Sequence, residues 1–310
     1  MLTQAPESVL MVRPSNFGFN PLTAGSNAFQ KIDTTASTAE INLQARKEFD
    51  YFTNQLIKAN IEVLIFEDHK NLILPDSVFP NNWISLHHDG TVVLYSLMAE
   101  NRRMERRKEI LLQLQNKYHF NIKRILDYSS HETDEQFLEG TGSVVYDYAH
   151  KIAYANVSPR TDADLFHQLC QELGFEGILF KTLGPSGKDI YHTNVMMCLG
   201  SGFAVVCLET VVTASMRSTL SESFERTGHE IVTISTSQMT EFAGNMIEVL
   251  NKAGVPVLVM STTAYHSLNK DQIRRLSQYG DILSIPIPVI EKSGGGSARC
   301  MMAGNFLPKL

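Results

Sequence analysis

The amino-acid sequence predicts a mixed α/β protein, because short β-branched runs alternate with helical patterns along the chain. The predicted strands are Ser8–Arg13, Glu62–Phe66, Thr91–Leu97, Ala204–Leu208 and Val255–Met260. The predicted helices are Ala39–Ala59, Asn101–Lys117, Asp162–Leu173 and Thr262–Tyr279. Gly174 follows the third of these helices, at a position where glycine commonly ends a helix. No Pro-, Gly- or Ser-rich linker interrupts the alternation, so we expect residues 1–310 to form a single domain.

A weak internal repeat of hairpins refines this fold class. Hairpins are predicted at 83–95, 143–155, 195–207 and 246–259, and a fifth unit begins at Cys300. The repeat length is about 50 to 60 residues, a range typical of propellers and arrays. Five ββαβ-like repeats could close into a five-bladed α/β propeller, which leaves no exposed strand edge. A chance likeness among hairpins is the alternative, because the units share no sequence beyond this pattern.

Polar residues stand directly before the predicted hairpins. They are Asn81 and Asn82, Glu139, His192 and Asn194, Asn245, and Cys300. If the units are arranged radially, these equivalent positions converge on one axis. Five motifs that are scattered in the sequence would then form one site.

The composition limits the classes of function. The chain has 310 residues, is 43% hydrophobic and 19% charged, and carries a net charge of −6, which gives no general attraction to nucleic acid or to an anionic membrane. No stretch is long and apolar enough to span a bilayer, and the first ten residues lack the pattern of a signal peptide. The four cysteines include no CxxC pair, so we expect a reduced cytoplasmic protein. The chain shows no nucleotide, flavin, pyridoxal or metal motif, which predicts no cofactor, and base rates allow a homo-oligomer.

Cys300 is the predicted nucleophile. It follows the segment Ser293–Arg299, whose three successive glycines let the backbone approach a ligand closely. A thiolate in this setting, with an arginine adjacent, is suited to covalent catalysis. A buried structural cysteine is the alternative, and we assign that role to Cys170, Cys198 and Cys207, which lie in apolar element interiors.

His192 is the predicted acid–base group, because a histidine titrates near neutral pH and can protonate a leaving amine. Glu139 is flanked by apolar residues and glycines, and such a carboxylate can orient a histidine or bind an N–H-rich group. Asp76 lies in a loop stiffened by prolines, where capping of a turn is an equally good interpretation. No histidine spacing indicates zinc. Surface or supporting roles are assigned to His87, His88, His150 and His266.

Four motifs together resemble the guanidino-group modifying superfamily, which includes arginine deiminases, dimethylarginine dimethylaminohydrolases and amidinotransferases. The motifs are Pro75–Phe79, Leu138–Ser143, His192–Asn194 and Gly294–Cys300. The resemblance runs over nearly the whole chain and is strongest to the bacterial citrulline-utilisation hydrolase branch. It implies the five-bladed α/β propeller called a pentein, in agreement with the hairpin repeat.

Carried over by position, the resemblance assigns the reacting groups. Cys300 matches the family nucleophile, His192 the catalytic histidine, and Glu139 the carboxylate beside that histidine. The implied enzyme is a cofactor-independent cysteine hydrolase. It cleaves a C–N bond of a ureido or guanidino amino acid through a covalent thio-intermediate.

Three further residues match substrate-binding positions. Asp76 matches a substrate-binding aspartate of the family. Arg102 and Arg160 match arginines that hold the substrate's α-carboxylate in dimethylargininases, a role that suits the fork of donors on a guanidinium. A solvated helix residue is the alternative for Arg102.

Asn81, Asn82 and Asn194 depart from the family pattern. Dimethylargininases carry acids at the first two positions and arginine deiminases carry aspartate at the third, where these acids would face a guanidinium cation. A buried carboxylate without a cationic partner is costly, whereas an amide both donates and accepts hydrogen bonds. The replacement favours a neutral ureido substrate, and we expect hydrolysis of citrulline to ornithine, ammonia and carbon dioxide. An arginine deiminase, a dimethylargininase, an amidinotransferase and a non-catalytic propeller binding protein are the alternatives.

Overall fold

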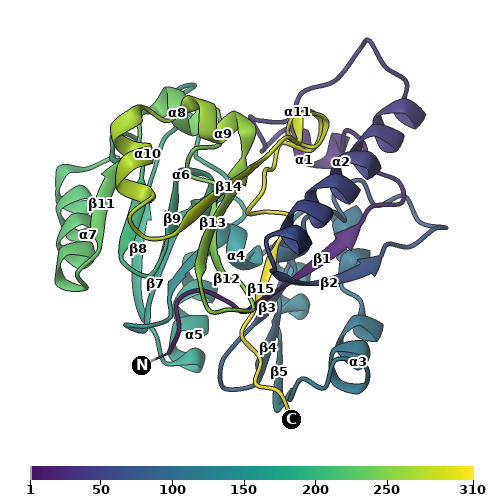
Figure 1. The fold of residues 1–310 in the computed structure, drawn as a ribbon, viewed down its shortest axis with the longest axis horizontal. Coiled ribbons are helices and arrows are strands. Elements are labelled where there is room, and N and C mark those ends of the chain that lie inside the picture. Colours follow the sequence, from purple (N-terminus) through teal and green to yellow (C-terminus); the bar gives the residue numbers. More distant parts are fainter. Residues whose placement is uncertain (1) are drawn as a thin grey trace.

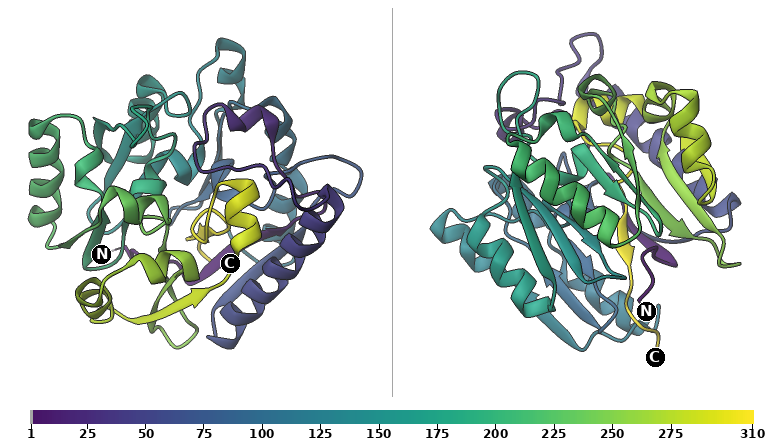
Figure 2. Two further views of the ribbon diagram at one scale, coloured as in Figure 1. Left: turned by 90° about the horizontal axis from the view of Figure 1, so that it is seen from above. Right: turned by 90° about the vertical axis from the view of Figure 1, so that its left-hand side faces the viewer.

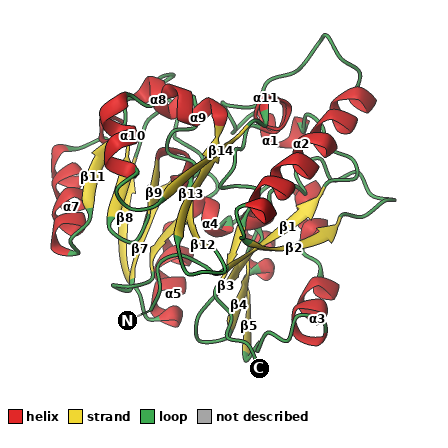
Figure 3. Cartoon of the chain, in the orientation of Figure 1, coloured by secondary structure: helices red, strands yellow, loops and turns green. Residues whose placement is uncertain are grey.

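One arrangement of three strands recurs in the computed structural model, which describes residues 2–310 (Figures 1 and 3). In its first occurrence β3 (Ile84–Leu86) pairs antiparallel with β4 (Thr91–Leu94), and β4 pairs parallel with β5 (Arg124–Asp127). The helix α3 (Lys108–Asn116) connects the two parallel strands, because a parallel pair needs a crossover. The predicted α/β class is confirmed.

Three more units repeat this ββαβ order. In each, the first two strands pair antiparallel and the last two pair parallel. The hairpins lie where the sequence predicts them. The elements are β6 (Val144–Asp147), β7 (Ile152–Val157), α5 (Ala163–Leu173) and β8 (Glu176–Lys181); β9 (Met197–Leu199), β10 (Phe203–Val206), α7 (Ala214–Arg226) and β11 (Glu230–Thr233); and β12 (Ile247–Leu250), β13 (Pro256–Ser261), α9 (Thr262–Ser267), α10 (Lys270–Leu276) and β14 (Asp281–Ile285).

The remaining unit combines the two ends of the chain. β15 (Ala303–Asn305) pairs antiparallel with β1 (Ser8–Arg13), which pairs parallel with β2 (Glu62–Glu67). β15 also pairs with β3, so that this unit and the first one share a six-stranded sheet, while the other units form separate three-stranded sheets. Figure 1 shows both chain ends at the same side of the molecule.

The crossover helices use apolar faces to cover the strands. α2 (Thr38–Lys58), which connects β1 and β2, buries Phe49, Phe52 and Leu56 completely. Burial of each such side chain contributes about 1.5–3 kcal/mol. Figure 2 shows α2 and α7 on opposite sides of the molecule. No helix among residues 2–310 is long and apolar enough to cross a membrane.

Two predicted helices are each broken in the structure. Asn101–Lys117 divides into a 3-10 helix, Glu100–Glu105, and α3, because Arg106 and Arg107 have extended backbones. Thr262–Tyr279 divides into α9 and α10, because Asn269 starts a new helix with a capping box that its side chain forms with Gln272. By contrast, α5 ends at Gly174 as predicted, and this glycine adopts the left-handed conformation.

Candidate active site

The segments that precede the hairpins lie against one another. They are the 3-10 helix Pro80–Asn82 and the short helices α4 (Gly140–Ser143) and α6 (Thr193–Met196). The close approach depends on glycine: Gly140 has a φ of 52°, and a Cβ there would lie 2.1 Å from the carbonyl oxygen of Asn81. The Leu-Glu-Gly-Thr-Gly motif is therefore shaped to pack against the asparagine motif.

Amide groups surround the sulfur of Cys300. Its Sγ accepts hydrogen bonds from Asn245 Nδ2 at 3.2 Å and from Asn194 Nδ2 at 3.5 Å. Asn245 is itself held, because its Nδ2 also donates to the Asn194 carbonyl and its Oδ1 accepts from the backbone N–H of Arg299. Hydrogen bonds from fixed donors stabilise a charged acceptor more than a neutral one, so these amides are placed to stabilise negative charge that develops on the sulfur during a reaction.

His192 and Glu139 form a buried pair. His192 Nε2 lies 2.8 Å from Glu139 Oε2, and Arg160 Nη1 approaches the same oxygen at 3.3 Å. Burial lowers the pKa of His192 to about 4, although the Glu139 carboxylate opposes this shift. Burial alone would raise the pKa of Glu139, but Arg160 and His192 hold it well below its usual range. At neutral pH the pair is therefore a carboxylate and a neutral imidazole.

Arg102 is buried, not a solvated helix residue. Its guanidinium donates to both carboxylate oxygens of Glu105 at 3.0 and 2.8 Å, and to Asn82 Oδ1 at 2.9 Å. Asp76 lies beside it, with Oδ2 3.7 Å from Arg102 Nε and 2.7 Å from the Asn20 amide that donates to it. Asp76 is thus a member of a buried polar cluster.

Arg160 is also engaged by the protein. Besides Glu139 it donates to Ser26 Oγ at 2.7 Å and to the Thr23 carbonyl at 3.2 Å, and it stacks 4.9 Å from the centre of the Tyr191 ring. Both arginines expected to bind a substrate carboxylate therefore already have oxygen acceptors. A carboxylate that binds here must share or replace these contacts.

One cavity collects most of the predicted residues. It is lined by Cys300, His192, Asp76, Asn82, Arg102 and Arg160, together with Gly294–Gly296. Asn82 Nδ2 and Asp76 Oδ1 are buried there without a hydrogen-bond partner. Only about 10 Å³ is open to the centre of a water-sized sphere, room for about one water. An amino acid can enter only if the cavity widens.

The other predicted residues stand behind this lining. Glu139 reaches the cavity through His192, and Asn194 through the sulfur of Cys300. Asn81 is fully buried with both amide atoms unpartnered, and it lines none of the described cavities.

Sequence reasoning assigned no role to several residues that support the site. The sequence places Asn245 among the polar residues that precede the hairpins, but it does not indicate that the amide of Asn245 contacts the sulfur of Cys300. No sequence signal indicated Glu105 as the partner of Arg102. Burial raises the pKa of Cys170 and Cys198 to about 12 and that of Cys207 to about 11, as suits structural thiols.

One group among residues 2–310 has metal-ligand geometry that the sequence spacing did not indicate. Asp147, His150 and His229 place one ligand atom each within 4.8 Å of one another. Asp147 ends β6, whereas Glu139 and α4 precede that strand. The group is therefore separated from the Cys300 cavity by the length of a strand.

Comparison with known proteins agrees with this fold. The model of the eukaryotic N,N-dimethylarginine dimethylhydrolase family matches residues 13–307. No curated protein sequence matches the chain. The fold resembles the N-terminal domain of the cyanobacterial enzyme ArgZ, in a structure bound covalently to a reaction intermediate. The TM-score is 0.70 at 17% sequence identity, and the match covers 97% of this chain and 99% of that one.

Two further solved structures share the fold. The apo structure of ArgZ, an arginine dihydrolase from the ornithine–ammonia cycle in cyanobacteria, has a TM-score of 0.70 at 18% identity, and the match covers 98% of this chain and 41% of that one. The second is a dimethylarginine dimethylaminohydrolase variant that carries an adduct with S-methyl-L-thiocitrulline. Its TM-score is 0.65 at 14% identity, and the match covers 96% of this chain and 98% of that one.

The family-model match and the shared fold show that the chain is a member of the guanidino-group modifying superfamily. Within it, the chain belongs to the N,N-dimethylarginine dimethylhydrolase family, whose model spans nearly the whole sequence. This membership confirms the predicted enzyme class, a hydrolase acting on non-peptide C–N bonds.

Gly142 provides a test of how tightly the site is packed. A Cβ there would lie 2.4 Å from Asn82 Nδ2 and 2.8 Å from His192 Nδ1. We expect Gly142→Ala to displace these groups and to lower kcat about 10²-fold, because misplacement by about 1 Å has this effect. Ammonia release measures kcat. Gly25→Ala is the matched control, since no heavy atom lies within 4 Å of its Cβ position; equal kcat in both variants would contradict the packing argument.

Proposed function

We propose that the protein hydrolyses citrulline to ornithine, ammonia and carbon dioxide. The observation that carries this proposal is the Asn82 amide, whose Nδ2 is buried without a partner in the cavity of Cys300. A ureido oxygen needs such a donor, whereas a guanidinium has only N–H groups to offer. The Asp76 oxygen without a partner, Oδ1, supplies an acceptor for a ureido N–H in the same cavity.

The first step forms a covalent bond between Cys300 and the ureido carbon. Neutral His192 takes the thiol proton, and Glu139 stabilises the resulting imidazolium through the 2.8 Å contact with Nε2. The thiolate attacks, and the Asn82 amide stabilises the charge on the oxygen. His192 then protonates the departing nitrogen, so that ammonia leaves and a thiocarbamoyl enzyme remains.

Hydrolysis completes the reaction. His192, neutral again, removes a proton from water, and the hydroxide attacks the thiocarbamoyl carbon. The C–S bond breaks and returns the thiol of Cys300, while the carbamate released decomposes to ornithine and carbon dioxide. No redox step or further co-reactant is required.

Ammonia release from four separate substrates tests the proposal. Purified protein is offered citrulline, arginine, agmatine and dimethylarginine. We expect turnover of citrulline above that of the guanidines. Turnover of arginine equal to or above that of citrulline would refute the ureido assignment and leave the hydrolase class intact.

Hydrolysis of a guanidine is the second candidate. The Asp76 carboxylate, with one oxygen free in the cavity, is suited to a guanidinium N–H group. The similar structure ArgZ is described as an arginine dihydrolase. If this chain hydrolysed arginine in two rounds, the first round would form a ureido product, which would then react again at the same cysteine. Release of ammonia from arginine, with citrulline formed transiently, would support this candidate.

Asn82 is the position where substrate choice should respond most directly. We expect Asn82→Asp to lower kcat/KM for citrulline by about 10²–10³-fold, because it removes the oxyanion donor. The added carboxylate should improve the ratio of arginine to citrulline turnover by more than about tenfold. Asn251→Asp, at an exposed turn, is the control. An unchanged ratio would show that Asn82 does not select the substrate.

Three finer features belong to the same proposal. The five units are arranged as the blades of an α/β propeller, supported by their common pairing and by the joining of β15 to β1. Residues 1–310 act as one domain. The four cysteines are free, which fits a cytoplasmic location.

A further inference from the structure

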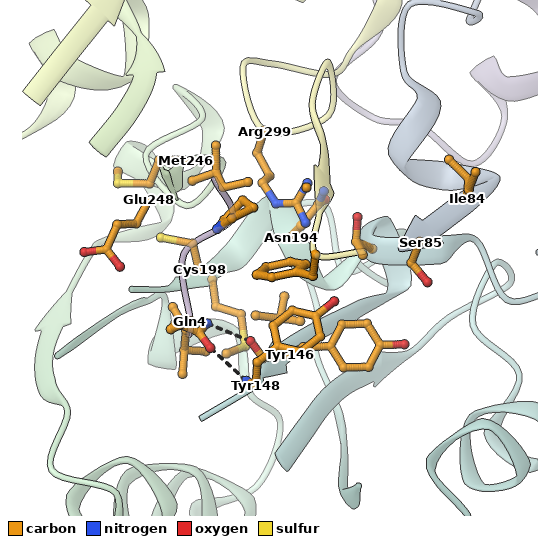
Figure 4. Close-up of a pocket in the computed structure, with 18 residues that line it drawn as sticks. Gln4, Ile84, Ser85, Tyr146, Tyr148, Asn194, Cys198, Met246, Glu248 and Arg299 are labelled. Carbon is orange, nitrogen blue, oxygen red and sulfur yellow. Dashed lines mark hydrogen bonds between the residues drawn. The ribbon is translucent and has the colours of Figure 1, made fainter. Parts of the chain in front are cut away.

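A second cavity has Asn194 in its lining (Figure 4), and the amide of this residue also donates to the sulfur of Cys300. It is lined by residues of β3, β6, β9, β12 and β15, the first strand of every unit. It shares no lining residue with the Cys300 cavity. About 50 Å³ is open to the centre of a water-sized sphere, several times what one water needs and too little for a nucleotide.

The guanidinium of Arg299 points into this second cavity (Figure 4). Its Nη1 donates to the Met302 carbonyl at 2.7 Å, and this is its one side-chain hydrogen bond among residues 2–310. No carboxylate of those residues lies within 4 Å of the Arg299 guanidinium, the distance limit for an ion pair. Arg299 is partly buried, and this burial lowers the pKa of its guanidinium. The remaining donors of the fork face the cavity.

Glu248, a carboxylate in the cavity lining, does not neutralise the charge of Arg299. Glu248 accepts hydrogen bonds from the N–H and hydroxyl of Ser201, at 2.7 and 2.6 Å. Figure 4 shows its carboxylate pointing away from Arg299. The hydroxyl of Tyr148, also in the lining, makes no hydrogen bond to another described residue and is a further donor. A partly buried charge and an unpaired donor therefore line a cavity in which no carboxylate contacts them.

We propose that the second cavity binds a small monovalent anion, held by the guanidinium of Arg299 and the hydroxyl of Tyr148. The site adjoins the nucleophile, because the backbone N–H of Arg299 donates to Asn245, whose amide donates to the sulfur of Cys300. An anion in this cavity restrains the loop that places both residues. This site is separate from the substrate cavity and does not depend on the identity of the substrate.

Bromide is the probe, because it is a small anion that X-rays can locate. Thermal unfolding of the full-length protein is followed in sodium bromide and in sodium gluconate at equal ionic strength. Gluconate is too large for the cavity. We expect bromide at saturation to raise Tm by about 2 °C over gluconate, since a ligand that binds only the folded state stabilises it. Equal Tm in both salts would overturn the proposal.

Two variants and a crystal locate the effect. Arg299→Gln keeps donors but removes the charge, and Tyr148→Phe removes one donor; the bromide shift should vanish in the first and shrink in the second. Arg274→Gln, at an exposed arginine paired with Asp271, should keep the full shift. A wild-type crystal soaked in bromide should show anomalous density beside Arg299. A shift that persists in Arg299→Gln, or density only elsewhere, would overturn the assignment even if a variant failed to fold.

Discussion

Cys300→Ala should abolish turnover, with a fall in kcat of at least about 10⁴-fold, because no other group near the reacting carbon can form the covalent intermediate. The thiol is buried between two amide donors, and one of them, Asn245, is also held by the Asn194 carbonyl and the backbone N–H of Arg299. The variant should therefore stay folded and retain substrate binding. Ammonia release measures the activity, and mass spectrometry after incubation with a thiol-directed substrate analogue locates the adduct.

Cys207→Ala is the matched control. Cys207 is completely buried in the apolar core, lies outside the Cys300 cavity, and has a pKa raised by burial. Its replacement should leave kcat within about twofold. The free energy of unfolding should fall by less than it does when a large core side chain is truncated to alanine. Residual turnover in Cys300→Ala, or an adduct on Cys207 instead, would show that the nucleophile has been misassigned.

The sequence predicted the hairpins well because each one is local. Turn residues such as Asp89 and Gly90 stand between two β-branched runs, and this signal needs no knowledge of the rest of the chain. Helix boundaries were predicted less well. Periodicity alone continues through Asn269, whereas the structure begins a new helix there, because a cap is decided by a few side-chain contacts.

The candidate site was predictable to the extent that it follows the repeat. Polar residues before each hairpin converge, so Cys300, His192 and Asn82 line one cavity as expected. Long-range partners were not predictable. Nothing in the sequence indicates that Arg102 is neutralised by Glu105. The sequence places Arg299 next to the nucleophile, but its side chain lines a different cavity.

Glu139→Gln should lower kcat by about 10²–10⁴-fold with a smaller change in KM. Glutamine keeps the size of the side chain but cannot stabilise the imidazolium that forms when His192 takes the thiol proton. Removal of the carboxylate also leaves Arg160, 3.3 Å away, as an uncompensated positive charge near that imidazolium. Glu48→Gln is the matched control, a buried carboxylate that instead binds the backbone N–H groups of Val289 and Ile290, and its kcat should change little.

The pH profile separates this role from a merely structural one. His192 must be neutral to accept the thiol proton, so wild-type activity should be lost as pH falls through about 4. Because this folded-state pKa is below the unfolded value of about 6.5, protonation also removes folding stability as pH falls from about 6.5 to 4. Glu139 raises the pKa of His192, so Glu139→Gln should move the acid limb of activity to lower pH while the plateau falls. An acid limb that stays in place, with only the plateau or the melting temperature reduced, would show that Glu139 supports the fold and does not position the acid–base group.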